Sequence, residues 1–274
     1  MPSPLPLPAR VLVKGASTVN WVSWMGGPRT DLGFPRAIEA ELHAAGRPAT
    51  VRNGAVLGQP TRHLVKEWQP EILQWSPDAV VILAGHYEAI HLFIPHWFER
   101  HANRVDRPTT GLQHLYFRKI IRAVWKPLVT VQSKIDGPLG TRLLRRRIRR
   151  MNRDLEGYIA KVRTVASPLI FVLELLPPAG AHNNWFPGMS DRIAMVNQVN
   201  RELIERLDEP DIRFFPVRDI VEEVAGGDPL AATPDGFHYT PALHGAIGRR
   251  LGQEIESWAK SQPHLSSVDL IEER

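Results

Sequence analysis

The sequence predicts an α/β protein in which helices cover both faces of a five-stranded parallel sheet, giving three layers. Five short segments rich in Val, Ile and Leu alternate along the chain with longer segments of helical periodicity. One of them, residues 79–84, is apolar throughout, as expected for a strand buried on both faces. No linker or repeat divides the 274 residues, so we expect one domain, 1–274, with a helical insertion or cap at about 89–140.

The amino-terminal half supplies the first three strands. The first ends at Gly15, and Ser17 follows two residues later. A helix predicted from Phe34 should stop before Gly46 and Pro48, which disfavour helical backbone. A later helix carries Pro70 in its interior, so we expect an interruption there. The expected strands are residues 10–14, 49–53 and 79–84, and the expected helices are residues 34–45 and 63–75.

The predicted insertion is aromatic at its start and basic at its end. Its apolar density predicts a cap that shapes an acyl or aromatic pocket beside the site. The residues concerned are Leu92, Phe93, Ile94, Trp97, Phe98, Tyr116, Phe117 and Trp125. Residues 116–125 look amphipathic and basic, and a helix with many arginines follows. Its expected buried positions recur at helical spacing: Leu144, Ile148, Met151, Leu155 and Ile159.

The carboxyl-terminal half completes the sheet. Residues 168–175 and 212–217 are the fourth and fifth predicted strands, with a helix at 195–207 between them. Thr240 and Pro241 suit the cap and the first position of a last helix. Its expected buried residues are Leu243, Ala246, Ile247, Leu251, Ile255 and Trp258.

Composition limits the classes of function. No apolar run is long enough to span a bilayer, and the proline-rich start lacks the features of a signal peptide, so we expect a cytoplasmic protein. The absence of cysteine excludes disulfides, thiolate metal sites and a cysteine nucleophile. The net charge of +5 and pI near 9.7 fit nucleic acid, anionic lipid or a phosphorylated substrate, but also an unevenly charged surface.

Three residues near the two ends of the chain could form a nucleophilic serine site. Ser17 follows a strand, where an α/β sheet presents residues to its ligand crevice. Asp235 and His238 lie three positions apart on a loop, so both side chains can reach one place. An imidazole can take the proton of a serine hydroxyl, and a carboxylate can orient that imidazole. His244 is a competing histidine, but it falls inside the last predicted helix.

Four short blocks in order resemble the SGNH, or GDSL-like, hydrolases. They are Gly15-Ala16-Ser17, the glycine best matched by Gly58, Gly85-His86-Tyr87-Glu88, and Asp235-Gly236-Phe237-His238. The resemblance implies sheet order 2-1-3-4-5 and acyl transfer through an ester on Ser17. It implies His238 as base and Asp235 as its orienting acid. Ester hydrolysis and acyl transfer to a sugar or other alcohol remain alternatives.

The resemblance also implies an oxyanion hole, and here the sequence departs from the family. Two donors would be the backbone N–H groups of Ser17 and Gly58. The third position, asparagine in the family, is Tyr87, whose hydroxyl is further from its backbone. Either Tyr87 donates, or it packs and His86, Asn53 or Gln59 substitutes for it. We expect Trp21, His86 and Glu88 near the substrate.

The arginine-rich segment 142–153 suggests an anionic partner. Arg145 and Arg149, with Arg153, share one stripe at four-residue spacing. A basic helix beside an acyl-transfer site suggests acyl-coenzyme A or an acyl carrier protein as donor. A solvated helix face is the plain alternative. The irregular spacing of His86, His91 and His96 predicts no metal site, and no motif calls for a cofactor.

Two other classes of function remain open at this point. The chain could be a catalytically inactive module that kept the fold and binds a ligand. Less well supported is a nucleic-acid-binding protein, because neither a groove-reading fold nor stacking aromatics on a sheet accompany the arginines.

Overall fold

The sheet of the protein has five parallel strands in the order β2-β1-β3-β4-β5, as predicted. We describe a computed structural model over residues 7–22, 28–90, 97–98, 101, 110–180, 186 and 188–266. The strands are β1 (Ala9–Gly15), β2 (Ala49–Asn53), β3 (Ala79–Leu83), β4 (Leu169–Leu173) and β5 (Ile212–Phe215). Every residue of β3 and β4 is buried, whereas the edge strands β2 and β5 are only partly buried.

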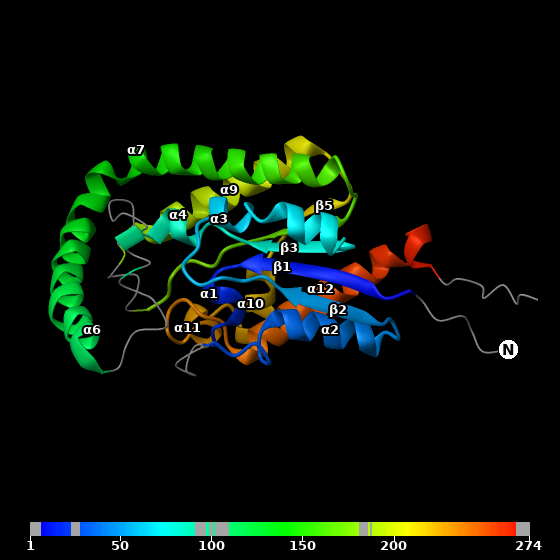
Figure 1. Ribbon diagram of the computed structural model, residues 1–274, viewed down its shortest axis with the longest axis horizontal. Coiled ribbons are helices and arrows are strands. Elements are labelled where there is room, and N and C mark those ends of the chain that lie inside the picture. The colour runs from blue at the N-terminus through cyan, green and yellow to red at the C-terminus, as the bar shows by residue number, and fades with distance from the viewer. Residues whose placement is uncertain are drawn as a thin grey trace, which may run out of the picture.

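Helices cover both faces of this sheet (Figure 1). Alternate residues of a strand point to opposite faces, so β3 feeds two cores. Val81 packs in the core that includes α2 (Phe34–Ala44) and α12 (Pro241–Ala259). Val80 and Ile82 pack in the core that includes α7 (Arg122–Arg163) and α9 (Met189–Leu207). The three-layer α/β prediction is therefore confirmed.

The α2–α12 contact depends on a missing side chain at Gly248. A Cβ there would lie 2.3 Å from the Ala37 Cβ and 2.7 Å from the Phe34 carbonyl oxygen. Only glycine allows the two helices to approach this closely. At the start of α12, the Thr240 hydroxyl accepts a hydrogen bond from the Leu243 N–H at 3.1 Å, and Pro241 is the first helical residue, as predicted.

Other element boundaries differ from the sequence-based expectations. The helix expected around Pro70 is two pieces, α3 (Thr61–Leu64) and the π-helix η1 (Gln69–Gln74). The structure adds α1 (Ser17–Asn20), α4 (His86–Ile90), α10 (Arg218–Ala225), α11 (Pro229–Ala232) and η3 (Pro263–Leu265). Apart from α10, these pieces are too short for a periodic pattern to reveal. α10 has apolar residues at positions 220, 221, 224 and 225, but it was not predicted from the sequence.

The insertion contains one continuous helical run. It begins with α6 (Gly111–Tyr116), passes through the π-helix η2 (Phe117–Ile121) and continues as α7. Figure 1 shows a bend that divides this run into an arm at the left and a part lying over the sheet. Gly137, Pro138 and Gly140 lie within α7, and proline lacks the N–H that the helix requires. None of the helices in the described residues combines the length and apolar character needed to cross a membrane.

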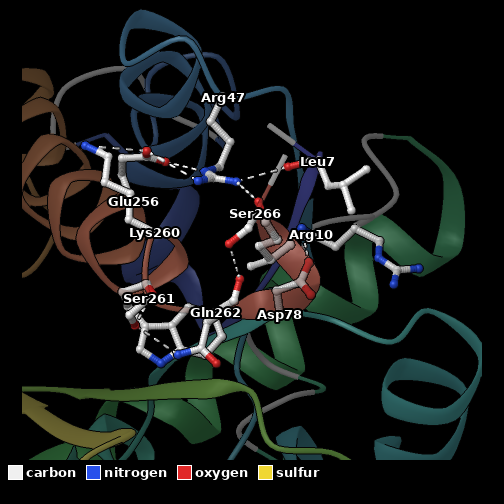
Figure 2. A network of polar contacts seen from close by, with 11 residues as sticks. Leu7, Arg10, Arg47, Asp78, Glu256, Lys260, Ser261, Gln262 and Ser266 are labelled. Atoms are coloured by element: carbon white, nitrogen blue, oxygen red, sulfur yellow. Dashed lines mark hydrogen bonds and ion pairs between the residues drawn. The ribbon is translucent and has the colours of Figure 1, made fainter. Parts of the chain in front are cut away.

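A buried arginine joins the first and last described segments of the chain at the amino-terminal edge of the sheet (Figure 2). Arg47 pairs with Glu256 of α12 and donates to the backbone oxygens of Leu7, at 3.1 Å, and Leu265, at 3.0 Å. Only 3% of the Arg47 side chain is exposed. This network fixes the edge of the sheet that lies opposite Ser17.

Candidate active site

Ser17 lies where β1 ends and α1 begins. Gly15 makes the turn possible, because a Cβ there would lie 2.4 Å from a methyl carbon of Val19 and 2.9 Å from the Leu83 oxygen. The carboxyl ends of parallel strands share one edge of a sheet, and Ser17 therefore stands at the ligand edge of this one.

Asp235 and His238 reach Ser17 from the loop between α11 and α12. One Asp235 oxygen accepts the N–H groups of Phe237, at 2.9 Å, and His238, at 2.7 Å, which closes a tight turn. Its other oxygen lies 2.7 Å from Nδ1 of His238. Nε2 of the same ring lies 3.1 Å from Oγ of Ser17. The three predicted residues therefore form one continuous chain of hydrogen bonds.

These hydrogen bonds stabilise the ionised form of the Asp235 carboxylate. Partial burial acts to raise the pKa of the Asp235 carboxyl, but hydrogen bonds from the His238 ring and from two backbone N–H groups outweigh it, and the net pKa is lowered. An ionised Asp235 favours the His238 tautomer with its proton on Nδ1. In that tautomer Nε2 is an acceptor and can take the proton of Ser17.

A cavity of about 110 Å³ opens at Ser17. It is lined by Ala16, Ser17, Thr18, His86, Tyr87, Ile90, Phe237 and His238. A water molecule occupies roughly 30 Å³ of liquid, so this space holds a small group. The Trp21 ring lies beside the site, with its centroid 5.7 Å from that of His238. Tyr87, His86 and Trp21 therefore lie close to Ser17 and His238.

Two buried histidines flank the site without belonging to the hydrogen-bond chain. Burial lowers the pKa of His86 to about 4, against the effect of a backbone hydrogen bond with Leu176. Burial likewise lowers the pKa of His244 to about 4. Nδ1 of His244 accepts the Phe34 N–H at 3.2 Å, so this competitor of His238 serves the core.

Other predicted site residues lie outside the Ser17 cavity. Gly58, whose φ is +71°, is in the loop before α3 and does not line it. Glu88 is buried, and its carboxylate accepts the Thr61 N–H at 2.7 Å, so it ties α4 to the loop that holds Gly58. Asn53 is engaged with Asn20 across a hydrogen bond of 2.5 Å. Arg145 and Arg149 are exposed along an open hollow of about 840 Å³ on α7.

The described residues of the predicted cap, 89–140, contribute little to the lining of the Ser17 cavity. Among these described residues only Ile90 lines the space at Ser17. Phe98, Phe117 and Trp125 pack instead with Ile121 in a separate small cluster. Leu92, Phe93 and Ile94, and also His91 and His96, lie outside the described residues.

A second cavity contains residues that the sequence did not single out. It has a volume of about 280 Å³ and is lined by Pro60, Arg62, His63, Glu88, Trp97, Arg147, Arg150, Met151 and Asp154. The two cavities share α4, which gives His86, Tyr87 and Ile90 to one and Glu88 to the other. Arg150 belongs to the arginine-rich segment 142–153 that the sequence singled out, whereas Arg62 was missed because only the fold brings its distant segment to this helix. Across the described residues, no group of three His, Asp or Glu side chains is arranged to hold a metal ion.

Solved structures show the same fold in known esterases. A structure of Axe2, an acetylxylan esterase from Geobacillus stearothermophilus, aligns over 90% of this chain and 94% of its own, with 16% identity and a TM-score of 0.56. A lipase/acylhydrolase from Enterococcus faecalis aligns over 91% and 96%, with 14% identity and a TM-score of 0.56. Three of the Axe2 structures carry catalytic mutations, one each of a serine, an aspartate and a histidine.

Sequence comparison extends this likeness. A search of curated proteins found no match. The model of the GDSL-like lipase/acylhydrolase family, in contrast, matches residues 15–246, which span both Ser17 and His238. This match covers well over half of the 274 residues. The chain therefore belongs to the GDSL-like lipase/acylhydrolase family.

Proposed function

We propose that the protein transfers acyl groups from esters through a covalent intermediate on Ser17. The observation that carries this proposal is the hydrogen-bond chain Asp235–His238–Ser17, with its 2.7 Å and 3.1 Å links. Family membership supports it, as do the catalytic serine, aspartate and histidine of Axe2.

The mechanism follows from where the protons lie. His238 Nε2 takes the Ser17 proton while Oγ attacks the ester carbonyl carbon. The protonated ring, stabilised by ionised Asp235, then gives that proton to the departing alkoxide. The alkoxide departs as an alcohol, and Ser17 remains acylated. An incoming water or alcohol loses its proton to His238 Nε2 and attacks the acyl carbon. The bond from that carbon to Oγ then breaks, and His238 returns the proton to Oγ, which restores the Ser17 hydroxyl.

Oxyanion stabilisation is proposed for the Ser17 backbone N–H and the Tyr87 hydroxyl; the expected donor Gly58 does not line this cavity. Tyr87 lines the cavity at Ser17, and His86 does so too. A neutral imidazole has a single N–H, and His86 engages the Leu176 backbone. Its remaining nitrogen is then an acceptor, suited to a hydroxyl of the substrate or acceptor rather than to an oxyanion.

The acyl group proposed is short, because the described space at Ser17 is only about 110 Å³. We also propose an anionic acyl donor, such as acyl-coenzyme A or an acyl carrier protein. Its phosphates would bind arginines of the second cavity, which shares α4 with the Ser17 cavity. The Arg145–Arg149 stripe is the alternative place for the donor. A sugar or other alcohol would then be the acceptor.

The direct test is mass spectrometry of the intact protein after incubation with p-nitrophenyl acetate. We expect one acetyl group on Ser17 in the wild type and none in Ser17→Ala. Ser257→Ala, at an exposed serine of α12, is the matched control and should acylate normally. An unmodified wild type that also releases no p-nitrophenol would instead favour the inactive, ligand-binding alternative.

Hydrolysis and transfer are separated by the fate of the acyl group. Wild-type protein is given the same ester with increasing glycerol or xylose, and the products are analysed. Ester products that exceed those formed in a matched Ser17→Ala reaction would support transfer, and acetate alone would support hydrolysis.

A further inference from the structure

The helical arm, residues 111–135, exposes an apolar row that the rest of the structure does not cover. It comprises α6, η2 and the first part of α7. Leu112 is 85% exposed, Ile120 53% and Val131 51%. The full row is Leu112, Leu115, Tyr116, Ile120, Val124, Leu128 and Val131. A contiguous exposed apolar surface of this length is costly in water and marks an interaction site.

The opposite side of the arm already has its own partners. Phe117 and Ile121 are buried, and Trp125 and Phe98 pack against them. The exposed row is therefore distinct from the side of the arm that packs against Phe98. Figure 1 shows the arm beyond the layers of the sheet, at the left, where a large flat partner could reach it.

The charge of the arm identifies the kind of partner. From Thr110 to Ile135 the sequence has five basic residues and no acidic one, the basic residues being Arg118, Lys119, Arg122, Lys126 and Lys134. Arg118, Lys119 and Arg122 are exposed, and none of them pairs with an acidic side chain of the described residues. Seven more arginines follow between residues 142 and 153.

Arg118 and Arg122 lie on a different side of the arm from the apolar row, whereas Lys119, four positions after Leu115 and three after Tyr116, lies at the border of that row. Arg118 and Arg122 are each two positions from Ile120, which places them roughly half a turn around the helix. This arrangement is typical of helices that lie in a bilayer surface, with the apolar side among acyl chains and the basic side near anionic headgroups. Nucleic acid would leave the aliphatic row uncovered, so the row and the charge together favour lipid.

We propose that the arm docks this protein onto the surface of bilayers rich in anionic phospholipid. The arm lies flat, with the row from Leu112 to Val131 in the interface and Arg118, Lys119 and Arg122 at the phosphates. The docking does not depend on the proposed acyl transfer, because no arm side chain lines the Ser17 cavity in the described residues. Ser17→Ala should therefore bind vesicles as the wild type does.

The test is co-sedimentation of the full chain with vesicles. We expect binding at least tenfold tighter to phosphatidylcholine–phosphatidylglycerol vesicles than to phosphatidylcholine alone, and weaker binding as salt is added. Leu112→Gln/Ile120→Gln/Val124→Gln should weaken binding at least tenfold. Arg118→Gln/Lys119→Gln/Arg122→Gln should weaken it about a hundredfold, at roughly fivefold for each basic residue.

Two sets of control variants carry matched changes away from the arm. Leu73→Gln/Val165→Gln/Val224→Gln removes apolar side chains that are 51%, 48% and 37% exposed. Arg10→Gln/Lys66→Gln/Arg249→Gln removes the same charge from exposed positions elsewhere. Both sets should bind like the wild type. The single change Leu112→Gln, at an 85% exposed side chain, tests the row without risk to folding.

Three results would overturn the proposal. One is equal binding to neutral and anionic vesicles, and another is arm variants that bind like their controls. The third is an association of the protein with itself, seen by sedimentation velocity without vesicles and abolished by the Leu112→Gln/Ile120→Gln/Val124→Gln change. That result would assign the row to a contact between copies of this chain.

Discussion

At the scale of single residues, the candidate site is assembled from opposite ends of the chain. Ser17 and His238 are 221 positions apart, yet Oγ and Nε2 lie 3.1 Å from each other. The serine is set by a strand end, and the histidine by the turn that Asp235 closes with its own carboxylate. Each residue thus has a local reason for its position.

Removing either reacting side chain should abolish activity. Ser17→Ala and His238→Ala should each lower kcat for p-nitrophenyl acetate by at least about a thousandfold, and the double variant should be hardly worse, because the residues act as a unit. Asp235→Asn should retain more activity than either, since Asp235 orients and does not react. Steady-state kinetics on variants with native circular dichroism measure this. An active Ser17→Ala protein would end the proposal.

Tyr87 can be tested by removing one oxygen. If its hydroxyl is an oxyanion donor, Tyr87→Phe should lower kcat on the order of a hundredfold with little change in KM, because the donor acts mainly in the transition state. Phe237→Leu, another change in the cavity lining, is the comparison and should act chiefly on KM. A Tyr87→Phe protein with unchanged kcat would show that the ring only packs.

At the scale of elements, a buried ion pair joins β1 to η1. Lys14 of β1 is 2% exposed and pairs with Glu71, which is 11% exposed. Burial lowers the pKa of Lys14 even though Glu71 acts to raise it. Taking either charge away leaves the other without compensation in a low-dielectric core.

Glu71→Leu should therefore lower the free energy of unfolding by about 3–5 kcal/mol. Lys14→Met/Glu71→Leu should recover most of this loss, because no buried charge remains. Urea denaturation measures both. Glu223→Ala, which breaks the exposed Arg250–Glu223 pair, should cost less than about 1 kcal/mol. A double variant as unstable as the single one would contradict this account of the pair.

The two arginine sets on and near α7 can be compared directly. Arg62→Glu/Arg150→Glu changes the second cavity, and Arg145→Glu/Arg149→Glu changes the stripe by the same charge. We expect the first to raise KM for a short acyl-coenzyme A at least tenfold and to leave turnover of p-nitrophenyl acetate nearly unchanged. If only Arg145→Glu/Arg149→Glu raises KM, the donor binds at the stripe and not in the second cavity. If neither pair of changes alters KM, both sets of arginines are only solvated surface.

At the scale of the whole molecule, two buried neutral histidines make stability depend on pH. His86 and His244 both have a folded pKa of about 4, below the ordinary value of 6.5. Between these values the unfolded chain binds more protons than the folded one. The contribution of these two neutral histidines to the free energy of unfolding is therefore fully present above pH 6.5 and is lost as the pH falls towards 4.

The free energy of unfolding should fall by as much as about 2–3 kcal/mol per pH unit within this window. In His244→Asn, which keeps an acceptor for the Phe34 N–H, the slope should be about half as steep, although stability at pH 7 is lower. Urea titrations between pH 4.5 and 7 measure the slope. Equal slopes for the wild type and His244→Asn would show that His244 does not contribute to the pH dependence of stability.

The sequence by itself determined the elements whose cause is local. Uniformly apolar runs marked β3 and β4, Thr240 and Pro241 marked the start of α12, and the spacing of Leu144 and Ile148 marked the buried side of α7. Asp235, His238 and Ser17 could be proposed because each stands in a short motif at the end of an element.

Only the tertiary structure decided which distant segments meet. It separated Glu88 from the Ser17 cavity, because that carboxylate is occupied by the Thr61 N–H. It brought Arg62 to Arg150 across elements, and it directed Phe117 and Trp125 to a cluster of their own. Periodicity reveals which side of a helix is apolar, but not what covers that side. Contacts between remote segments depend on the packing of the whole chain, which no local pattern encodes.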